Sequence, residues 1–335
     1  MRSPVAVVGA GSWGTTLANL LAKKGYPVRL WAHEPRVADG INERRENESY
    51  LPGILLDERL RATSDLREAV KDAEIVVSVS PSQYVRQVMA EASGSIRADA
   101  LLVSASKGIE VATLKTMAEV LADVVPHAAE RACFLSGPSF ALEVAREKPT
   151  AVTVASGVES AALQAQELFQ TEYFRVYTSD DVRGVELGGA LKNVIALAAG
   201  MAVGLDLGHN ALAALITRGV AEISRLGVAL GASPLTFAGL AGMGDLILTC
   251  TGDLSRNRRV GVQLGRGRPL DEILAEMKMV AEGVETTRAA YALAGRVGIE
   301  MPILAEVHAV LFEGGDPLTA VRNLMHREPK AELWQ

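Results

Sequence analysis

One lysine stands inside a strongly apolar stretch of the chain. Lys192 belongs to the run "ELGGALKNVIALAAG", in which Gly188 and Gly189 lie one helical turn earlier on the same side. An ammonium group in such surroundings is costly unless it is paired, and loss of water lowers its pKa toward values useful for proton transfer. The missing glycine side chains leave room for a ligand or a close backbone. We expect Lys192 to exchange protons; the alternative is a lysine whose ammonium reaches water.

Two further polar groups follow apolar runs that are expected to be strands. Lys107 comes directly after the run 101–105, and Ser139 follows a Gly137-Pro138 turn after the run "CFLS". Open α/β sheets bind ligands at the carboxyl ends of their strands, so Lys107 would face a cofactor and an anionic substrate. Ser139 is expected to be the N-cap of the next helix, whose free amides would form a second anion-binding surface. The alternatives are a solvated lysine and an ordinary helix cap.

The segment "GLAGMGDLILTCTGDLSRNRRVG" supplies an acid and a basic group. Asp245 lies in a glycine-rich turn, and Ser255-Arg256-Asn257 reads as the entry to a helix. A guanidinium forms two parallel hydrogen bonds to a phosphate, and the neighbouring hydroxyl and amide would add to that contact. The segment therefore predicts a phosphate site. The alternative is a solvated basic turn that includes the next two arginines.

The stretch "VAVVGAGSWGTTLA", residues 5 to 18, places three glycines between an apolar run and a helix-like run. Gly9 would make a tight turn, Gly11 would let a pyrophosphate approach the backbone, and Gly14 would let the helix pack close to the strand. The helix N-terminus, near Ser12 and Trp13, would meet the phosphates. Because the motif follows an expected strand and opens an expected helix, it indicates a dinucleotide site rather than an ordinary glycine-rich turn.

The residues after the second expected strand leave the choice between NAD and NADP open. Glu34 lies twenty residues after Gly14, where an acid would hold the 2′-hydroxyl of the adenosine ribose, and this favours NAD. His33 and Arg36 flank Glu34, and a basic pair could instead accept a 2′-phosphate. Simple surface charge is the alternative for all of them.

These residues need a scaffold that brings strand ends and helix starts together. Short apolar runs recur in the first half and alternate with helix-compatible stretches; they are "PVAVVG", "PVRLWA", "EIVVSVS", "LLVSAS", "ACFLS", "AVTVAS" and "FRVYT". Such strands predict a doubly wound parallel sheet covered on both faces. After Thr178 the strand signals stop and long Ala/Leu-rich helical segments begin. We expect a Rossmann-like α/β domain over residues 1–179, an all-helical domain over 180–335, and a ligand cleft at their junction.

Composition restricts the class of partner. The chain has 335 residues, which favours two domains, and a net charge of −6, which argues against nucleic-acid-binding or anionic membrane-binding surfaces. Its longest apolar stretch, 194–205, is too short to span a bilayer and is expected to be a core helix.

Cys133 and Cys250 are far apart, which indicates two buried thiols and a cytoplasmic protein. His, Cys and carboxylate residues do not cluster at metal-ligand spacing, so no metal site is expected.

Together, these stretches resemble the bacterial NAD(P)-dependent glycerol-3-phosphate dehydrogenases, which reduce dihydroxyacetone phosphate. The matching segments cover nearly the whole chain in the family's order; they are "GAGSWGT", "SKGIE", "SGPSFA", "ELGGALKNVIA", "ALITRG", "AGMGDLILTC" and "SRNR". The resemblance implies hydride transfer between NAD or NADP and the phosphorylated ketone, with Lys192 as proton donor and acceptor and Lys107 and Asp245 beside it. It also implies a homodimer that supplies glycerol 3-phosphate for phospholipid synthesis.

The resemblance also implies which residues bind the two ligands. Those around the substrate would be Lys107, Gly137, Ser139, Asp245, Ser255, Arg256 and Asn257. Those in contact with the cofactor would be Gly9, Gly11, Ser12, Trp13, Gly14, His33, Lys107, Ala141, Arg256, Val280 and Glu282. The family's central motifs are all present, and only positions 33 to 36 leave the cofactor preference open.

Other functions would make different use of the same features. A β-hydroxyacid dehydrogenase or ketopantoate reductase would share the glycine turn and a catalytic lysine on a helix, but the phosphate segment at Arg256 argues against it. A dinucleotide-sensing regulator would need a DNA-binding module or an effector surface, which the net charge of −6 and the lack of a basic domain disfavour. A purely structural role would leave Lys107 and Lys192 without a purpose in apolar, glycine-rich surroundings.

Overall fold

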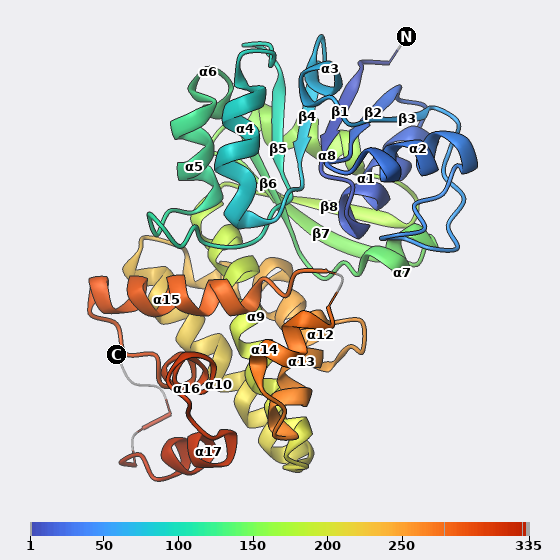
Figure 1. Ribbon diagram of the computed structural model, residues 1–335. Coiled ribbons are helices and arrows are strands. Elements are labelled where there is room, and N and C mark those ends of the chain that lie inside the picture. Colours follow the sequence, from blue (N-terminus) through green and yellow to red (C-terminus); the bar gives the residue numbers. More distant parts are fainter. Residues whose placement is uncertain (1, 278, 330, 333–335) are drawn as a thin grey trace.

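The first half of the chain is built on one eight-stranded sheet, seen in a computed structural model that describes residues 2–277, 279–329 and 331–332. The strands lie in the order β3-β2-β1-β4-β5-β6-β7-β8 (Figure 1). They are β1 (Val5–Val8), β2 (Val28–Trp31), β3 (Leu60–Thr63), β4 (Ile75–Ser78), β5 (Leu101–Ser104), β6 (Cys133–Ser136), β7 (Thr150–Ala155) and β8 (Phe174–Ser179). The central strands β1, β4, β5 and β6 are buried along their whole length, as continuous apolar runs require.

The last two strands run against the other six. β7 pairs antiparallel with β6, whereas every other neighbouring pair is parallel, so the sheet is mostly rather than wholly parallel. The connection from β6 to β7 contains only the five-residue helix α7 (Ala141–Ala145). Such a helix rises about 7.5 Å, which is too little to carry the chain back along the sheet.

Helices cover both faces of the sheet, which confirms the doubly wound architecture. They are α1 (Ser12–Lys23), α2 (Pro35–Arg44), α3 (Leu66–Val70), α4 (Val85–Ser93), α5 (Met117–Val124), α6 (Pro126–Ala129) and α8 (Glu159–Phe169), with a short 3-10 turn η1 (Ser82–Tyr84). β1 shows how the strands serve two cores. Val5 and Val7 pack with α1 and α8, whereas Ala6 and Val8 pack with α4 and α5 on the opposite face.

The second half is helical and lies beneath the sheet in Figure 1. Its elements are α9 (Val182–Gly204), α10 (Gly208–Ala229), α11 (Pro234–Phe237), the π-helical turn η2 (Leu240–Gly244), α12 (Asp245–Thr251), α13 (Arg256–Gly265), α14 (Leu270–Ala275), α15 (Gly283–Val297), α16 (Pro302–Phe312) and α17 (Pro317–Met325). Within the described residues no strand follows Ser179. This part of the fold matches the expected all-helical half.

Glycines let α9 and α13 cross at backbone contact. A Cβ on Gly200 would lie 2.1 Å from the carbonyl oxygen of Arg258, and a Cβ on Gly261 would lie 2.1 Å from that of Leu197. Only glycine allows so close an approach without displacing the backbone. The crossing fixes the start of α13 relative to the helix that carries Lys192.

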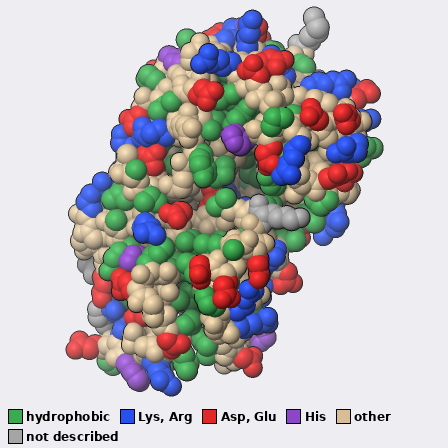
Figure 2. Space-filling model, in the orientation of Figure 1, with side chains coloured by type: hydrophobic (Ala, Val, Ile, Leu, Met, Phe, Trp, Pro, Cys, Tyr) green, Lys and Arg blue, Asp and Glu red, His purple; other side chains and the backbone are tan. Residues whose placement is uncertain are grey.

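Two segments are long and apolar enough to cross a membrane by length and composition alone. The apolar stretch of α9 is 89% buried inside the protein, as in a core helix. The segment Pro234–Thr251 is 39% buried and comprises α11, η2 and α12. Because the core helices of soluble proteins can have the same length and apolar composition, these two segments are weak evidence for a membrane span. On the face in Figure 2, acidic and basic side chains are interspersed over both halves.

Candidate active site

Three predicted residues meet where the two halves join. Lys192 Nζ donates to Asp245 Oδ1 at 2.5 Å, and Lys107 Nζ donates to Asp245 Oδ2 at 2.6 Å. Lys192 Nζ also donates to Thr249 Oγ1 at 3.0 Å, and Lys107 Nζ lies 3.3 Å from the Gly137 carbonyl oxygen. Lys192 is 8% exposed and Asp245 is 1% exposed. The ammonium of Lys192 is therefore paired inside the protein rather than extended into water.

Three different elements bring this cluster together. Lys192 lies in the middle of α9, Asp245 begins α12, and Lys107 lies in the loop after β5. A Cβ on Gly188 would lie 2.6 Å from the carbonyl oxygen of Ala241 in η2, which explains why this position, the first of the glycine pair, has no side chain. The second glycine, Gly189, lies against the hydroxyl of Ser136 in β6 and against the side-chain carbons of Lys107. The space at the two glycines is thus filled by backbone and side chains of this chain.

The electrostatics of the cluster favour proton exchange near neutral pH. Burial lowers the pKa of Lys192 to about 8, although the charge of Asp245 opposes the shift. Burial alone would raise the pKa of Asp245, but the ammonium groups of Lys107 and Lys192 outweigh it and lower that pKa. Asp245 therefore stays ionised and holds both lysines, and Lys192 can gain or lose a proton close to neutral pH.

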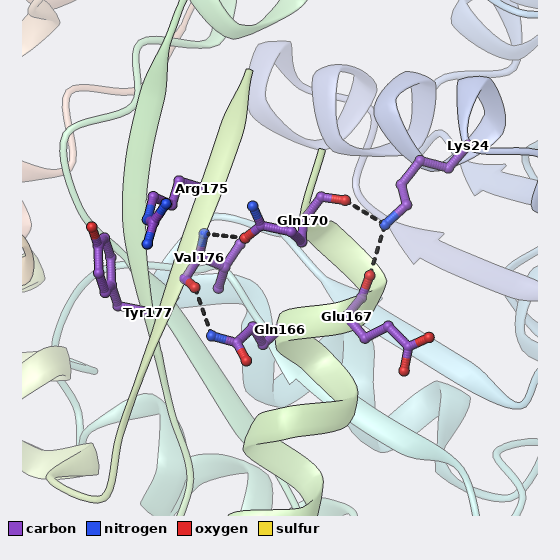
Figure 3. A pocket seen from close by; sticks show the side chains of 7 residues that line it. All are labelled: Lys24, Gln166, Glu167, Gln170, Arg175, Val176 and Tyr177. Carbon is purple, nitrogen blue, oxygen red and sulfur yellow. Dashed lines mark hydrogen bonds between the residues drawn. The ribbon is translucent and has the colours of Figure 1, made fainter. Parts of the chain in front are cut away.

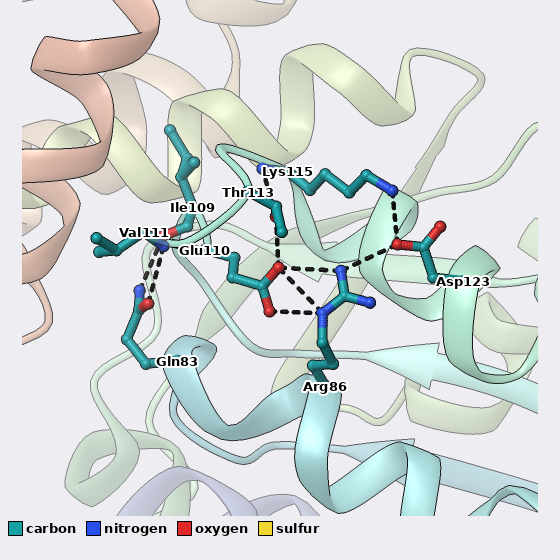
Figure 4. A network of polar contacts seen from close by, with 8 residues as sticks. All are labelled: Gln83, Arg86, Ile109, Glu110, Val111, Thr113, Lys115 and Asp123. Carbon is teal, nitrogen blue, oxygen red and sulfur yellow. Dashed lines mark hydrogen bonds and ion pairs between the residues drawn. The ribbon is translucent and has the colours of Figure 1, made fainter.

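Polar contacts fix the loop after β5 that presents Lys107 (Figure 4). Arg86 of α4 forms a two-pronged pair with Glu110, in which Nε to Oε1 and Nη2 to Oε2 both measure 2.9 Å. The Gln83 side chain donates to the Ile109 carbonyl at 2.8 Å and accepts from the Val111 amide at 3.0 Å. The backbone is therefore held two to four residues after Lys107.

The turn between β1 and α1 has the form expected of a dinucleotide site. Gly9 has φ +122°, and a Cβ on Gly14 would lie 1.8 Å from the Gly9 carbonyl oxygen. Among the described residues, no heavy atom lies within 4 Å of a Cβ placed on Gly11. α1 begins at Ser12, and Trp13 packs partly buried against the core of the sheet. The turn leaves open space at the helix amides, where phosphates bind.

The end of β2 holds a carboxylate whose oxygens are already engaged. Glu34 Oε1 accepts from Tyr50 Oη at 2.6 Å, and Glu34 Oε2 accepts from Arg36 Nε at 2.8 Å. The hydroxyl of Ser12 donates to the carbonyl oxygen of Tyr50. His33 is exposed. Arg36 is therefore paired with Glu34, and His33 also lies near this carboxylate.

The predicted phosphate segment does open a helix. Ser255 Oγ accepts from the Arg258 amide at 3.2 Å and so caps α13, whose first residue is Arg256. Asn257 is buried, and its Nδ2 donates to Asn193 Oδ1 at 2.9 Å. Its Oδ1 accepts from the first amide of α15 at 3.0 Å. The segment is thus tied to both α9 and α15, and Arg256 lies at a capped helix N-terminus.

The turn after β6 differs from its prediction. Gly137 has φ +137°, and its carbonyl accepts from Ser139 Oγ at 2.9 Å. The N-cap residue of α7 is Phe140, so the prediction that Ser139 caps this helix is wrong. The serine hydroxyl bonds the backbone two residues earlier, a local alternative open to short polar side chains. Ala141 lies beside α1, where its carbonyl accepts from Thr16 Oγ1 at 3.2 Å.

Residues 279–282 reach from the helical half to the cofactor half. Glu282 Oε1 accepts from the Ser82 amide at 3.0 Å, and Ser12 Oγ lies 3.4 Å from the sulfur of Met279. Burial raises the pKa of Glu282, although the Ser82 amide opposes the shift. Val280 is 49% exposed. The structure therefore places Glu282 at the junction and Val280 at its surface.

The sequence analysis missed three residues that form polar contacts in or beside the site. Thr249 lies four residues after Asp245 and so on the same helix face, which the helical period could have found. Asn193 directly follows the buried lysine and holds the phosphate segment. Tyr50 lies in the connection between α2 and β3, and no spacing in the sequence links it to the acid at the end of β2.

A pocket of about 540 Å³ lies away from this cluster, at the outer edge of the sheet (Figure 3). It is lined by Lys24, Gln166, Glu167, Gln170, Arg175, Val176 and Tyr177. Lys24 Nζ donates to the carbonyl oxygens of Glu167 at 2.7 Å and Gln170 at 2.6 Å. These bonds satisfy the last carbonyls of α8. The lysine here has a structural role, and the pocket contains none of the predicted site residues.

Metal-ligand side chains and thiols among the described residues were the remaining candidates for a reactive centre. Among the residues that the structure describes, no group of three or more His, Cys, Asp and Glu side chains is placed to hold a metal ion. Cys133 and Cys250 are free and buried. Burial raises the pKa of Cys133 to about 11 and that of Cys250 to about 12, so both thiols stay protonated at neutral pH.

Known proteins match nearly the whole chain. Two family profiles match it, described as NAD-dependent glycerol-3-phosphate dehydrogenase N-terminus over residues 4–162 and C-terminus over residues 181–322. A relative from Geobacter metallireducens called glycerol-3-phosphate dehydrogenase (NAD(P)+) is 58% identical over 333 residues, 99% of each chain. A relative of the same name from Citrifermentans bemidjiense is 57% identical over 333 residues, which again make up 99% of each chain. The crystal structure of glycerol-3-phosphate dehydrogenase from Coxiella burnetii is similar with a TM-score of 0.93 and 40% identity, covering 97% of this chain and 99% of that one.

Proposed function

Since the chain belongs to the NAD-dependent glycerol-3-phosphate dehydrogenase family, we propose that Lys192 is the acid and base with which it interconverts dihydroxyacetone phosphate and sn-glycerol 3-phosphate. The observation that carries this role is the buried contact of Lys192 with Asp245, which also binds Lys107. A proton donor with a pKa of about 8 thereby lies at the junction with the dinucleotide-binding half.

The residues around the glycine turn fit a dinucleotide. Gly11 faces open space, and α1 is a twelve-residue helix whose first amides lack partners within the helix. The residues that would hold the cofactor are Gly9, Gly11, Ser12, Trp13, Gly14, His33, Lys107, Ala141, Arg256, Val280 and Glu282. When bound, NAD(P)H supplies a hydride to the ketone carbon.

The proton step belongs to Lys192. As an ammonium it gives a proton to the carbonyl oxygen, so that the ketone becomes a secondary alcohol. In the reverse direction the neutral amine takes the hydroxyl proton. Asp245 holds the Lys192 nitrogen at 2.5 Å and stabilises its ammonium form, while Lys107 contacts both ligands.

The phosphate of the substrate belongs at the start of α13. Arg256 offers a planar fork of donors, and the capped helix N-terminus adds amides that favour an anion. Ser255 and Asn257 lie on either side of Arg256 and complete this end of the site. Gly137 and Ser139, near Lys107, would surround the glycerol part.

The two halves of the chain have different proposed roles. We propose that residues 1–179 bind the cofactor and that residues 180–335 bind the substrate and form a homodimer. The end of β8 at Ser179 and the change of family profile between residues 162 and 181 support this boundary. We propose further that the enzyme works in the cytoplasm and supplies glycerol 3-phosphate for phospholipid synthesis.

The test is turnover of purified protein with dihydroxyacetone phosphate, followed by the oxidation of NADH and of NADPH. Unphosphorylated dihydroxyacetone and ketopantoate serve as controls. Turnover that requires the phosphate supports the proposal, and turnover of ketopantoate would replace it with the related reductase. Tight dinucleotide binding without turnover of any substrate would favour a sensor.

A further inference from the structure

The loop that carries Lys107 lies against the connection between β4 and α4. Just before the lysine, Ser106 Oγ donates to the Ser80 carbonyl oxygen at 2.6 Å. Just after it, Gly108 has φ +156°, and a Cβ there would lie 2.2 Å from Ser82 Oγ. Only glycine allows so close an approach in that backbone conformation. The residues on both sides of Lys107 therefore contact one short segment of the chain, residues 80–82.

Two side chains that follow this segment bind the loop further along (Figure 4). Gln83 Nε2 donates to the Ile109 carbonyl oxygen at 2.8 Å, and Gln83 Oε1 accepts from the Val111 amide at 3.0 Å. Arg86 donates to both carboxylate oxygens of Glu110, from Nε to Oε1 and from Nη2 to Oε2, at 2.9 Å each. Glu110 is 5% exposed, so this pair is shielded from water. The two-pronged form fixes orientation as well as distance.

The same loop is anchored in the helical half of the molecule. The side chain of Ile109 is fully buried in the core that contains Leu191 of α9. Lys107 itself donates to Asp245 Oδ2 at 2.6 Å and lies 3.3 Å from the carbonyl oxygen of Gly137. The loop therefore spans the junction of the two halves. Because Ile109 is only two residues from Lys107, a shift of the backbone at Ile109 would move the lysine as well.

The position of the Lys107 ammonium affects the pKa of Lys192. Burial lowers the pKa of Lys192, the charge of Asp245 opposes that shift, and the charge of Lys107 adds to it. Burial raises the pKa of the nearby Cys250 to about 12, so this thiol carries no charge at neutral pH. If Lys107 moved away from Asp245, its effect on Lys192 would weaken. The pKa of Lys192 would then rise.

We propose that the Arg86–Glu110 pair positions the Lys107 ammonium for the reaction by holding its loop against the N-terminal half. Gln83 acts in the same way through the loop backbone. All three side chains act through Lys107, so they are positioning residues. The inference rests on the proposed function, in which Lys107 contacts both ligands and its charge acts on Lys192. A purely structural role would affect stability alone, whereas a positioning role also changes how the reaction depends on pH.

The experiment compares Glu110→Gln, Gln83→Met and the control Asp99→Asn with the unmodified chain. Asp99 accepts a two-pronged pair of bonds from Arg97, at 2.8 and 2.7 Å, just before β5 begins. The control therefore removes the same kind of ion pair at the opposite end of the same strand. The readouts are the pH profile of kcat/KM for dihydroxyacetone phosphate, the Tm of each variant, and a crystal structure of Glu110→Gln.

Glu110→Gln keeps the shape of the side chain but replaces a charged pair with weaker bonds. We expect kcat/KM to fall about tenfold, less than the roughly 10²-fold that a 1 Å misplacement can cost. The alkaline limb of the profile should move to higher pH, because Lys107 would lower the pKa of Lys192 less. Gln83→Met should lower kcat/KM by about threefold and move the limb in the same direction. Asp99→Asn should leave the profile unchanged.

An alkaline limb that stays in place in Glu110→Gln would overturn the proposal, whatever the Tm, because a loss of stability alone does not move the pKa of Lys192. A shift in Glu110→Gln without one in Gln83→Met would overturn the role of Gln83. In the crystal structure of Glu110→Gln, Lys107 should lie farther than 2.6 Å from Asp245, and an unchanged contact would also contradict the proposal. If the unmodified chain turns over no substrate, the proposed function fails instead, and this crystal structure still decides whether Glu110 positions Lys107.

Discussion

At the scale of single residues, the site depends on the balance between burial and pairing at Lys192. Burial disfavours its ammonium form and Asp245 favours it, and the two effects leave the pKa at about 8. An exposed lysine would stay charged at neutral pH and would part with its proton far less readily. Burial and the charge of Asp245 together therefore set the pH range in which Lys192, the proposed acid and base, can gain or lose a proton.

Lys192→Met should lower kcat by about 10²- to 10⁴-fold, the usual contribution of a positioned proton donor. The methionine keeps the apolar stem, so Kd for the reduced cofactor should stay close to that of the unmodified chain. Steady-state kinetics and fluorescence titration would measure the two effects. Lys71→Met, which alters an exposed lysine at the end of α3, is the matched control. Near-normal turnover of Lys192→Met would refute the assignment.

Asp245→Asn should change the pH dependence of the reaction. The charge of Asp245 raises the pKa of Lys192, so its removal should lower that pKa below about 8. Reduction needs the ammonium form, and the alkaline limb of kcat/KM for dihydroxyacetone phosphate should therefore move to lower pH. A profile measured between pH 5 and 10 tests the shift, and an unmoved alkaline limb would contradict it.

Arg256→Ala should mainly raise KM for dihydroxyacetone phosphate. A phosphate clamp acts in both the ground state and the transition state, so the loss appears in binding more than in kcat. Initial rates over a range of substrate concentrations would separate the two terms. Arg259→Ala, three residues later on α13 and exposed, is the control. An unchanged KM in Arg256→Ala would place the phosphate elsewhere.

At the scale of elements, the crossing of α9 and α13 sets the distance between Lys192, the proposed proton donor, and the proposed phosphate segment at Arg256. Gly200→Ala would place a Cβ 2.1 Å from a backbone carbonyl that cannot move aside. We expect a loss of stability of about 1–3 kcal/mol and a rise in KM for dihydroxyacetone phosphate. Thermal unfolding and initial rates measure these changes.

Gly295→Ala is the matched control for this crossing. No described atom lies within 4 Å of a Cβ at that exposed position of α15. Alanine favours a helix over glycine by up to about 1 kcal/mol, so Tm should stay constant or rise. If Gly200→Ala were as stable as this control, the close crossing would have no energetic role.

Sequence reasoning succeeded for elements whose evidence is local. The glycine turn, the apolar strands and the capped start of α13 each carry their signal within a few residues, and the structure has all three. It failed where two local arrangements compete or where a more distant residue decides the outcome. Ser139 satisfies its own turn instead of α7, and β7 reverses because the helix before it is short. The pairing of Tyr50 with Glu34 spans sixteen residues without a periodic pattern to announce it.

At the scale of the whole molecule, a half-buried and a buried carboxyl group link helices to one another. Glu186 of α9 accepts from the Ala118 amide of α5 at 2.8 Å and so links the two halves. Glu222 of α10 accepts from the Ile303 amide at the start of α16 at 2.9 Å. Burial raises the pKa of each to about 7, from an ordinary value of 4.5. Between these pH values the folded chain binds protons that the unfolded chain releases.

The sign of the resulting pH dependence follows from linkage. The stabilisation by these protonated acids is fully present below about pH 4.5 and is lost as pH rises toward about 7. Tm should therefore fall as the pH rises from 5 to 8. Glu186→Gln and Glu222→Gln should each flatten this slope in calorimetric scans, whereas Glu43→Gln should not. A slope identical in all three variants would show that other groups set it.

The position of Lys192 midway along the core helix α9 also matters for laboratory redesign of the enzyme. A library randomised around this lysine would lose most of its members to misfolding, because its neighbours on α9 are buried. Arg256 and Glu34 lie at helix ends and are partly exposed, so substitutions there cost little stability. Directed evolution should therefore alter the ligands that this protein accepts far more readily than the proton chemistry it performs on them.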